Sequence, residues 1–335
     1  MSTPAPKPSV TISCFSDEIS ANFRTQLEVT QALGLKHISI RSGDPAATGR
    51  SNNIMKWDEH EATVALRMLD EFGIKVAEFG SPIGKVKLRD QEDGTTNRYV
   101  EPNHYRDEVR RACDLAVRFG AKRMRGFSFY QPKGLNPDDF LTEAADQLSD
   151  VVAVCAKAGL IYGVELEANL VGDNGARLVQ IAKIIGNDKL RLVADPANIT
   201  CQNIRGGAVD SHQAMRPHLG WMHAKDYRID PNATWKGHVD EDGLKNFVPF
   251  GTGDSDVGLL LALLAEDIPR LESELAALGV TDGVLVTLEP HLRGGGQFGG
   301  FSGTDGMGIA LRALCKCLDR SSIGYDLLGY EQMKR

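Results

Sequence analysis

Leu190-Arg-Leu-Val-Ala-Asp-Pro-Ala-Asn198 begins as an apolar run and ends in an aspartate followed by a proline. A run of this length is typical of a β-strand that is buried on both faces, and proline cannot donate a hydrogen bond to a sheet. We therefore predict a strand over Leu190 to Asp195, with Asp195 at its carboxyl end.

Three further stretches repeat the pattern of a short apolar run that ends in a carboxylate or an imidazole. They are Val164-Glu-Leu-Glu-Ala-Asn169, Trp221-Met-His-Ala-Lys-Asp226 and Val284-Leu-Val-Thr-Leu-Glu-Pro-His291. Four predicted strand ends thus offer side chains of the kind that bind metals. The mouth of a parallel barrel is where strands so far apart in sequence can bring such ligands to one point.

The rest of the chain alternates predicted strands with predicted helices. Strands are expected at 10–15, 37–41, 75–80, 123–130, 161–167, 190–195, 221–226 and 283–289. Helices are expected at 23–33, 59–72, 104–119, 137–158, 175–185, 260–278 and 306–318, and none is assigned between residues 195 and 221. This order favours one α/β domain, a (β/α)8 TIM barrel over residues 10–335, behind a flexible N-terminal tail over residues 1–9.

Two polar segments are too long for ordinary connections in such a barrel. Lys85 to Asn103 follows the third predicted strand, and Tyr227 to Phe250 follows the seventh. The first insert is a candidate lid or oligomer contact, and a disordered surface loop is an equal alternative. The second insert would form part of the roof over the barrel mouth, and its sequence does not assign which of its residues contact a substrate.

The overall composition is that of an ordinary globular protein of 335 residues, 42% hydrophobic and 25% charged. A net charge of −7 disfavours a nucleic-acid partner. The six cysteines include no CxxC pair, so we expect reduced thiols. No stretch approaches the roughly 18 apolar residues of a membrane span, and the N-terminus lacks the apolar region of a signal peptide. We therefore expect a cytoplasmic protein that binds a small molecule, with no nucleic-acid or membrane partner.

The acidic residues at the strand ends suggest a cation. Glu165 and Glu167 lie two apart on one predicted strand, so both side chains face the same side and would join Asp195 and Glu289 if they face inward. Such a cluster of buried carboxylates needs a positive charge. With a single imidazole it suits Mn²⁺, Mg²⁺ or Co²⁺, whereas structural zinc more often recruits cysteine. For each acid taken alone, a partly solvated carboxylate is the alternative.

Several motifs carry a family resemblance. LEAN (166–169), ADPAN (194–198), MHAKD (222–226), PFGTGD (249–254) and LEPH (288–291) resemble, in this order, the xylose-isomerase-like TIM-barrel superfamily and its sugar phosphate isomerase/epimerase family. FSDEI (15–19), GSPIGK (80–85) and FSFY (127–130) extend the resemblance to the whole chain. It implies a divalent-metal site, with Mn²⁺ expected first and Mg²⁺, Co²⁺ or Zn²⁺ as alternatives, held by Glu165, Asp195, His223 and Glu289.

The resemblance also assigns roles to individual residues. Glu165 and Glu289 would be the catalytic base and acid as well as ligands, and Glu167 would contact a substrate hydroxyl. Asn198 stands where many relatives have histidine, which argues against the endonuclease branch. Asn198, Lys225 and His291 complete the expected substrate-binding set. For Lys225 an ion pair with Glu167 or Asp226 is an alternative, and for His291 a simple loop position.

The resemblance implies an isomerase or epimerase of a keto-sugar or related polyol, acting by proton transfer through a metal-stabilised enediolate. A metal-dependent lyase or dehydratase, which eliminates a β-substituent from a keto-sugar or 3-oxo-glycoside, is the alternative because it begins with the same enolate. A non-catalytic sugar-binding subunit is a third hypothesis. A homo-oligomer or a partner subunit is left open by the sequence.

Overall fold

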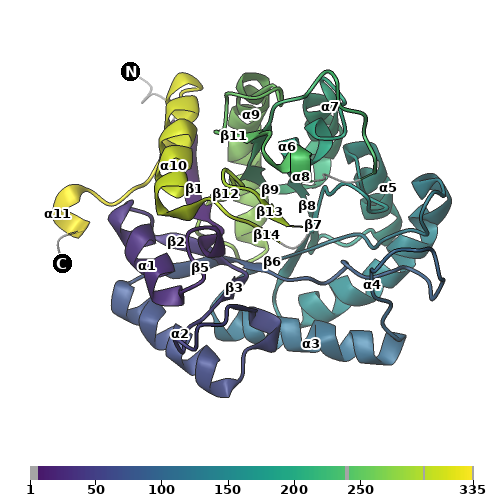
Figure 1. Ribbon diagram of the computed structural model, residues 1–335, viewed down its shortest axis with the longest axis horizontal. Coiled ribbons are helices and arrows are strands. Elements are labelled where there is room, and N and C mark those ends of the chain that lie inside the picture. The colour runs from purple at the N-terminus through teal and green to yellow at the C-terminus, as the bar shows by residue number, and fades with distance from the viewer. Residues whose placement is uncertain (1–6, 238–240, 297–298, 334–335) are drawn as a thin grey trace.

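The computed structural model describes residues 7–237, 241–296 and 299–333. Its centre is a curled sheet of parallel strands, surrounded by helices (Figure 1). The barrel strands are β1 (Ser9–Cys14), β2 (His37–Ile40), β5 (Lys75–Gly80), β6 (Arg123–Gly126), β7 (Ile161–Glu165), β8 (Leu190–Ala194), β9 (Leu219–Ala224) and β12 (Val284–Leu288). From β2 onward each pairs with the next, and β12 pairs with β1. The predicted (β/α)8 barrel is therefore confirmed.

The seam between β1 and β2 is closed differently at its two ends. At the carboxyl ends of the strands, a single bridge joins Phe15 to Ser39. At the amino ends, β15 (Gly324–Tyr325) pairs with the first residues of β1. Because Leu328 N–H also donates to the carbonyl of Gly34 at 2.8 Å, the C-terminal segment lies along the amino end of this seam. Of the predicted tail, residues 1–6 lie outside the described part of the chain.

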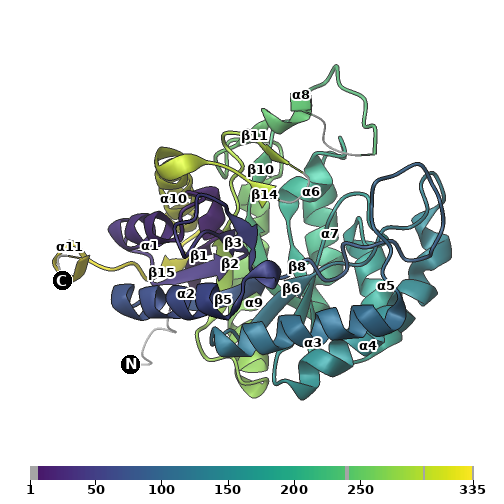
Figure 2. The same cartoon turned by 60° about the horizontal axis from the view of Figure 1, so that its bottom comes forward.

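The main helices cover the outside of the barrel (Figure 2). One of them, α2, is capped at both ends: it begins with a capping box between Asp58 and Glu61 and ends at Gly73, whose φ of 65° suits glycine. The longer helices are α1 (Phe23–Ala32), α2 (Glu59–Phe72), α3 (Pro102–Arg118), α4 (Leu141–Lys157), α5 (Gly175–Ile185), α7 (Gly207–Met215), α9 (Val257–Ala277) and α10 (Gly303–Arg320). Shorter ones are α6 (Pro196–Thr200), α8 (Glu241–Leu244) and α11 (Tyr330–Met333). Among the described residues, no helix has the length and apolarity needed to cross a membrane.

Three details differ from the sequence prediction. The strand predicted over 123–130 ends at Gly126, and Phe129 further on has a left-handed φ of 70° that a regular strand does not accept. The strand predicted over 161–167 ends at Glu165, so Glu167 lies beyond it. The segment without predicted helices contains α6 and α7, because Pro196 takes the first turn of α6 and the Asp195 side chain caps that helix.

Described parts of both inserts reach the cavity at the barrel mouth. The first runs beside the segment that follows β6, where the backbone of Lys87 forms a parallel β-bridge with Tyr130. The ammonium of Lys87 pairs with Asp93 at 2.8 Å. In the second, β10 (Asp226–Tyr227) pairs antiparallel with β11 (Phe247–Val248), and this segment projects with α8 at one end of the barrel (Figure 2). Two further pairs of two-residue strands are present. β3 (Ser42–Gly43) pairs with β4 (Asn52–Asn53), and β13 (Gly295–Gly296) pairs with β14 (Gly299–Gly300).

A polar layer crosses the inside of the barrel. Hydroxyl groups from β1, β2 and β12 contact one another, with Ser13 Oγ 2.9 Å from Ser39 Oγ and 2.8 Å from Thr287 Oγ1. Ser39 and Thr287 both donate to the carboxylate of Glu78, at 2.7 and 3.1 Å. This layer places a buried acid directly beside the ring of His223.

Candidate metal centre and active site

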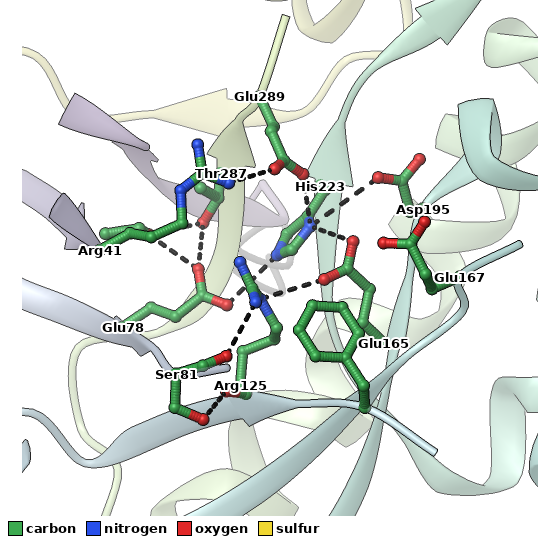
Figure 3. A network of polar contacts seen from close by, with 12 residues as sticks. Arg41, Glu78, Ser81, Arg125, Glu165, Glu167, Asp195, His223, Thr287 and Glu289 are labelled. Carbon is green, nitrogen blue, oxygen red and sulfur yellow. Dashed lines mark hydrogen bonds and ion pairs between the residues drawn. The ribbon is translucent and has the colours of Figure 1, made fainter. Parts of the chain in front are cut away.

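The structure brings the four expected metal ligands to one place. One ligand atom from each of Glu165, Asp195, His223 and Glu289 lies within 4.8 Å of the others, and all four side chains are buried. They come from β7, β8, β9 and β12, or from the residue just after these strands, which are neighbours in the sheet (Figure 3). The carboxyl ends of four adjacent strands therefore converge at the barrel mouth.

The donor atoms suit a cation at the centre of this cluster. His223 Nδ1 lies 3.4 Å from Glu165 Oε1, 3.2 Å from Glu289 Oε2 and 3.9 Å from Asp195 Oδ2. Nδ1 of His223, Oδ2 of Asp195 and Oε2 of Glu289 are buried without a hydrogen-bond partner. Because buried polar atoms are costly when left unpaired, oxygen and nitrogen atoms that converge in this way fit a divalent metal ion.

The opposite nitrogen of the imidazole is held by Glu78. Nε2 of His223 lies 3.2 Å from Glu78 Oε1, which also accepts a hydrogen bond from Trp221 Nε1 at 2.9 Å. Burial raises the pKa of Glu78, but His223 and Arg125 outweigh it and lower that pKa to about 2. An ionised Glu78 favours a proton on Nε2 and leaves the lone pair of Nδ1 for a metal.

Two arginines contact the glutamates of this cluster. Arg41, the residue after β2, donates from Nη1 to Glu289 Oε1 at 2.8 Å. Arg125 on β6 forms an ion pair with Glu165, with 3.0 Å between Nε and Oε2. Arg41, Arg125 and Glu78 were not predicted as site residues. The signal for them is a charged residue near the end of a predicted strand, the same signal that identified the candidates on the last four strands.

The electrostatics of the cluster reflect its excess of carboxylates. Burial raises the pKa of Asp195 to about 7, although Lys225 opposes the shift. For Glu289 the effect of burial is outweighed, first by Lys225 and then by His223 and Arg41, so its pKa lies well below the ordinary value. The pKa of His223 is raised far above 6.5, because Glu165 and Glu78 outweigh its burial. The cluster thus attracts positive charge, which a divalent cation can supply in place of protons.

Three of the expected substrate-binding residues lie close to the ligands. Asn198 donates from Nδ2 to Glu165 Oε1 at 3.2 Å and accepts from Lys225 at 3.2 Å. Lys225 forms ion pairs with Asp195 at 3.3 Å and with Glu289 at 3.6 Å. Glu167 is further out and pairs with Lys85 of the first insert at 3.0 Å. Asn198 and Lys225 therefore contact the expected ligands themselves, while Glu167 lies on the wall above them.

His291 is buried and connects the ligand cluster to Glu18. Its backbone, with φ of 52°, donates an N–H to Glu18 Oε2 at 2.9 Å, and its Nδ1 lies 3.1 Å from the carbonyl oxygen of Glu289. Burial and the charge of Glu289 raise the pKa of Glu18 to about 8. Glu18, Glu289 and His291 also lie within ligand distance of one another. Because Nδ1 faces a carbonyl and Arg41 holds Glu289, this group does not resemble a second metal centre.

A cavity of about 760 Å³ opens above the ligands. Glu165, Glu289, Arg41 and Arg125 reach it from the barrel, and Phe127 and Phe247 add aromatic surface. Residues 94–97 of the first insert and 236–237 of the second also line it. The first insert is thus part of the cavity wall. An enclosed space of this size beside a polar cluster is typical of a small-molecule site.

Comparison with known proteins agrees with this architecture. The sequence profile of the xylose isomerase-like TIM barrel family matches residues 27–269. The chain belongs to this family. Among curated protein sequences, none matches the chain at a significant level.

Solved structures with this fold include several enzymes. The IolI protein with a bound zinc atom has a TM-score of 0.64 and 15% identity, over 93% of this chain and 99% of that chain. D-allulose 3-epimerase from Methylomonas sp. has a TM-score of 0.61 and 13% identity, over 93% and 99%. The probable 3-DHS dehydratase AsbF from Bacillus anthracis has a TM-score of 0.59 and 14% identity, over 92% and 99%. At these identities the likeness of this xylose isomerase-like barrel to its neighbours shows the fold alone.

Proposed function

We propose that this xylose isomerase-like barrel is a divalent-metal-dependent isomerase or epimerase of a keto-sugar or related polyol. The observation that carries the proposal is the convergence of Glu165, Asp195, His223 and Glu289 beneath a large cavity. Three of the atoms that face one another, in Asp195, His223 and Glu289, have no hydrogen-bond partner. The epimerase among its structural neighbours supports a carbohydrate as the substrate.

The ligand atoms favour a hard cation. Three carboxylates and one imidazole form an oxygen-rich set, for which Mn²⁺ is our first choice and Mg²⁺ or Co²⁺ are alternatives. The zinc atom in the IolI structure keeps Zn²⁺ among the candidates. When bound, the ion would polarise the carbonyl and the neighbouring hydroxyl of the substrate and so stabilise an enediolate.

Glu165 and Glu289 are the proposed proton carriers. They lie on β7 and just after β12, at the two ends of the arc β12-β9-β8-β7, so a substrate between them would present one face to each. One carboxylate removes the proton on the carbon next to the carbonyl, and the other returns a proton to the product. Glu167, on the cavity wall, would bind a substrate hydroxyl.

Elimination is the second candidate. Removal of the same proton, followed by loss of a β-substituent, would make the chain a lyase or dehydratase. The cavity favours this possibility in one respect, since its 760 Å³ and the surfaces of Phe127 and Phe247 leave room for a substituent on the sugar. A dehydratase of the same fold also supports it.

The test is a screen of keto-sugars and 3-oxo-glycosides with added Mn²⁺, analysed by NMR in D₂O. An isomerised or epimerised product supports the first proposal, and an unsaturated product supports the second. Tight Mn²⁺ binding with no exchange of the α-proton of any candidate would contradict both and favour a sugar-binding subunit. His223→Ala is the matched control, because it removes one ligand without changing the two proton carriers.

A further inference from the structure

We propose that Arg41 and Arg125 are positioning residues that aim the two glutamate ligands. Each arginine holds one oxygen of a glutamate, here called the outer oxygen, and leaves the inner oxygen facing the centre of the ligand cluster (Figure 3). The inference rests on the metal centre of the proposed function, and it holds whichever reaction the centre catalyses.

In Glu165, Arg125 contacts the outer oxygen and leaves the inner oxygen facing the cluster. Its outer oxygen, Oε2, lies 3.0 Å from Arg125 Nε, and its inner oxygen, Oε1, lies 3.4 Å from Nδ1 of His223. Arg125 is itself fixed, because it is buried and donates from Nη1 to the carbonyl of Ser81 at 3.1 Å. The contact between Nε and Oε2 is a charge pair without hydrogen-bond geometry. Together with the hydrogen bond from Asn198 Nδ2 to Oε1, it favours the orientation in which the inner oxygen faces the cluster.

Arg41 does the same for Glu289 from the other side of the barrel seam. The outer oxygen, Oε1, accepts from Arg41 Nη1 at 2.8 Å, and the inner oxygen, Oε2, lies 3.2 Å from Nδ1 of His223. Nε of Arg41 donates to Asp17 Oδ2 at 2.9 Å, which orients the guanidinium plane. A planar fork with several donors can satisfy two carboxylates at once, which a lysine cannot do with the same geometry.

One aromatic ring connects the two arginines with the histidine ligand. Phe15, at the end of β1, has its ring centroid 4.5 Å from the guanidinium carbon of Arg41 and 5.1 Å from that of Arg125. Its ring also meets His223 edge-on, with centroids 5.2 Å apart and planes at 89°. Cation–π contacts with a fully buried ring restrict both guanidinium groups. Three of the four ligands therefore depend on supports that meet at Phe15.

The charge of each arginine and its proposed positioning role predict opposite effects on metal affinity when the arginine is removed. A guanidinium beside a ligand carboxylate repels a divalent ion, so its removal should tighten metal binding if charge alone mattered. If the arginine positions the carboxylate, its removal frees the side chain to turn away, and metal binding should weaken. Loss of an outer partner of a metal ligand typically costs about 10–100-fold in metal affinity. The sign of the change therefore distinguishes the two accounts.

The decisive experiment is calorimetric titration of chelator-treated protein with Mn²⁺, for wild type, Arg41→Met and Arg125→Met. We expect Mn²⁺ to bind each variant about 10–100-fold more weakly than wild type. Unchanged or tighter binding would overturn the proposal. The matched control is Arg123→Met, two residues earlier on β6, where the buried arginine pairs with Asp282 at 2.8 Å. It removes an equally buried charge away from the ligands, and its folded fraction should bind Mn²⁺ like wild type.

Arg41→Lys and Arg125→Lys provide a second test if a methionine variant does not fold. Lysine keeps the charge but loses the fork, so weaker Mn²⁺ binding supports positioning and wild-type binding contradicts it. Circular dichroism of each variant separates a folding defect from a binding defect. A wild-type protein that binds Mn²⁺ without turning over any keto-sugar would defeat the proposed function only. Active variants with unchanged Mn²⁺ affinity would defeat this inference only.

Discussion

Glu78 Oε1 lies 3.2 Å from Nε2 of His223, on the side of the imidazole away from the carboxylate ligands. Both side chains are completely buried, and the acid comes from β5 whereas the histidine comes from β9. Neighbouring strands in the barrel do not explain this contact, since β6, β7 and β8 separate the two along the sheet. The contact crosses the barrel interior, and it fixes which nitrogen of His223 faces the metal ligands.

Glu78→Gln should therefore weaken metal binding by about 10–100-fold, the usual effect of losing a partner of a ligand histidine. Glutamine keeps the size of the side chain but removes the charge that favours a proton on Nε2. The measurement is Mn²⁺ titration of the chelated variant. Ser39→Ala, which removes one hydrogen bond to Glu78 and keeps its charge, is the control and should have a smaller effect. Wild-type affinity in Glu78→Gln would show that the tautomer is set elsewhere.

Metal removal should abolish turnover, and Mn²⁺ or Co²⁺ should restore it, because four side chains of metal-binding type converge at this point. A ligand that binds only the folded state raises the melting temperature. We therefore expect added Mn²⁺ to raise the melting temperature of chelated wild type and to leave that of His223→Ala almost unchanged. Full activity in His223→Ala, or after exhaustive chelation, would remove the basis for a metal centre.

The sequence sufficed to predict the barrel and to name four residues whose side chains converge. Apolar runs ending in Asp195 or Glu289 are local signals, and parallel strands place their carboxyl ends at one mouth. These features need no knowledge of side-chain contacts. The family profile and the fold confirm the barrel, while the chemical roles of the residues remain predictions.

What the sequence did not reveal depends on contacts across the barrel. Glu78 and Arg41 lie in or next to predicted strands, but their partners His223 and Glu289 come from strands that are not their neighbours. Arg125 pairs with Glu165 of the adjacent strand β7, a contact that depends on the register of the two strands. The end of β6 was also missed, because nothing local marks the left-handed backbone of Phe129. Pro196 predicted the end of a strand, but its sequence context did not predict that it also begins α6.

Glu165→Gln and Glu289→Gln should each lower kcat by about 10²–10⁴-fold, the usual contribution of a general acid or base. Glu167→Gln should mainly raise KM, because Glu167 lies on the cavity wall and pairs with Lys85 rather than with the ligands. Steady-state kinetics at saturating Mn²⁺ separate the two effects. Equal and small losses in all three variants would show that the catalytic pair has been misplaced.

Glu18 should make stability depend on pH. Its pKa is raised from 4.5 to about 8, first by burial and then by the charge of Glu289. A carboxyl whose folded pKa is raised stabilises the fold while it is protonated, and this contribution is lost as the pH rises from about 4.5 through 8. Glu18→Gln cannot ionise, so metal-free wild type should lose more stability than the variant between pH 5 and pH 8. Urea unfolding at both values measures this difference, and parallel losses would contradict the raised pKa.

The origin of the transferred hydrogen tests the reaction itself. If Glu165 and Glu289 move a proton at the carbon next to the carbonyl, substrate turned over in D₂O should carry deuterium at that carbon in an isomerised or epimerised product. In an eliminated product the same hydrogen should be lost to solvent. A single carboxylate that both removes and returns the proton would give partial internal return, so the labelling is followed over prolonged turnover and compared with Glu165→Gln and Glu289→Gln. A product that stays free of deuterium after many turnovers would mean that the hydrogen moves directly between the two carbons, and the acid and base roles of Glu165 and Glu289 would then be wrong.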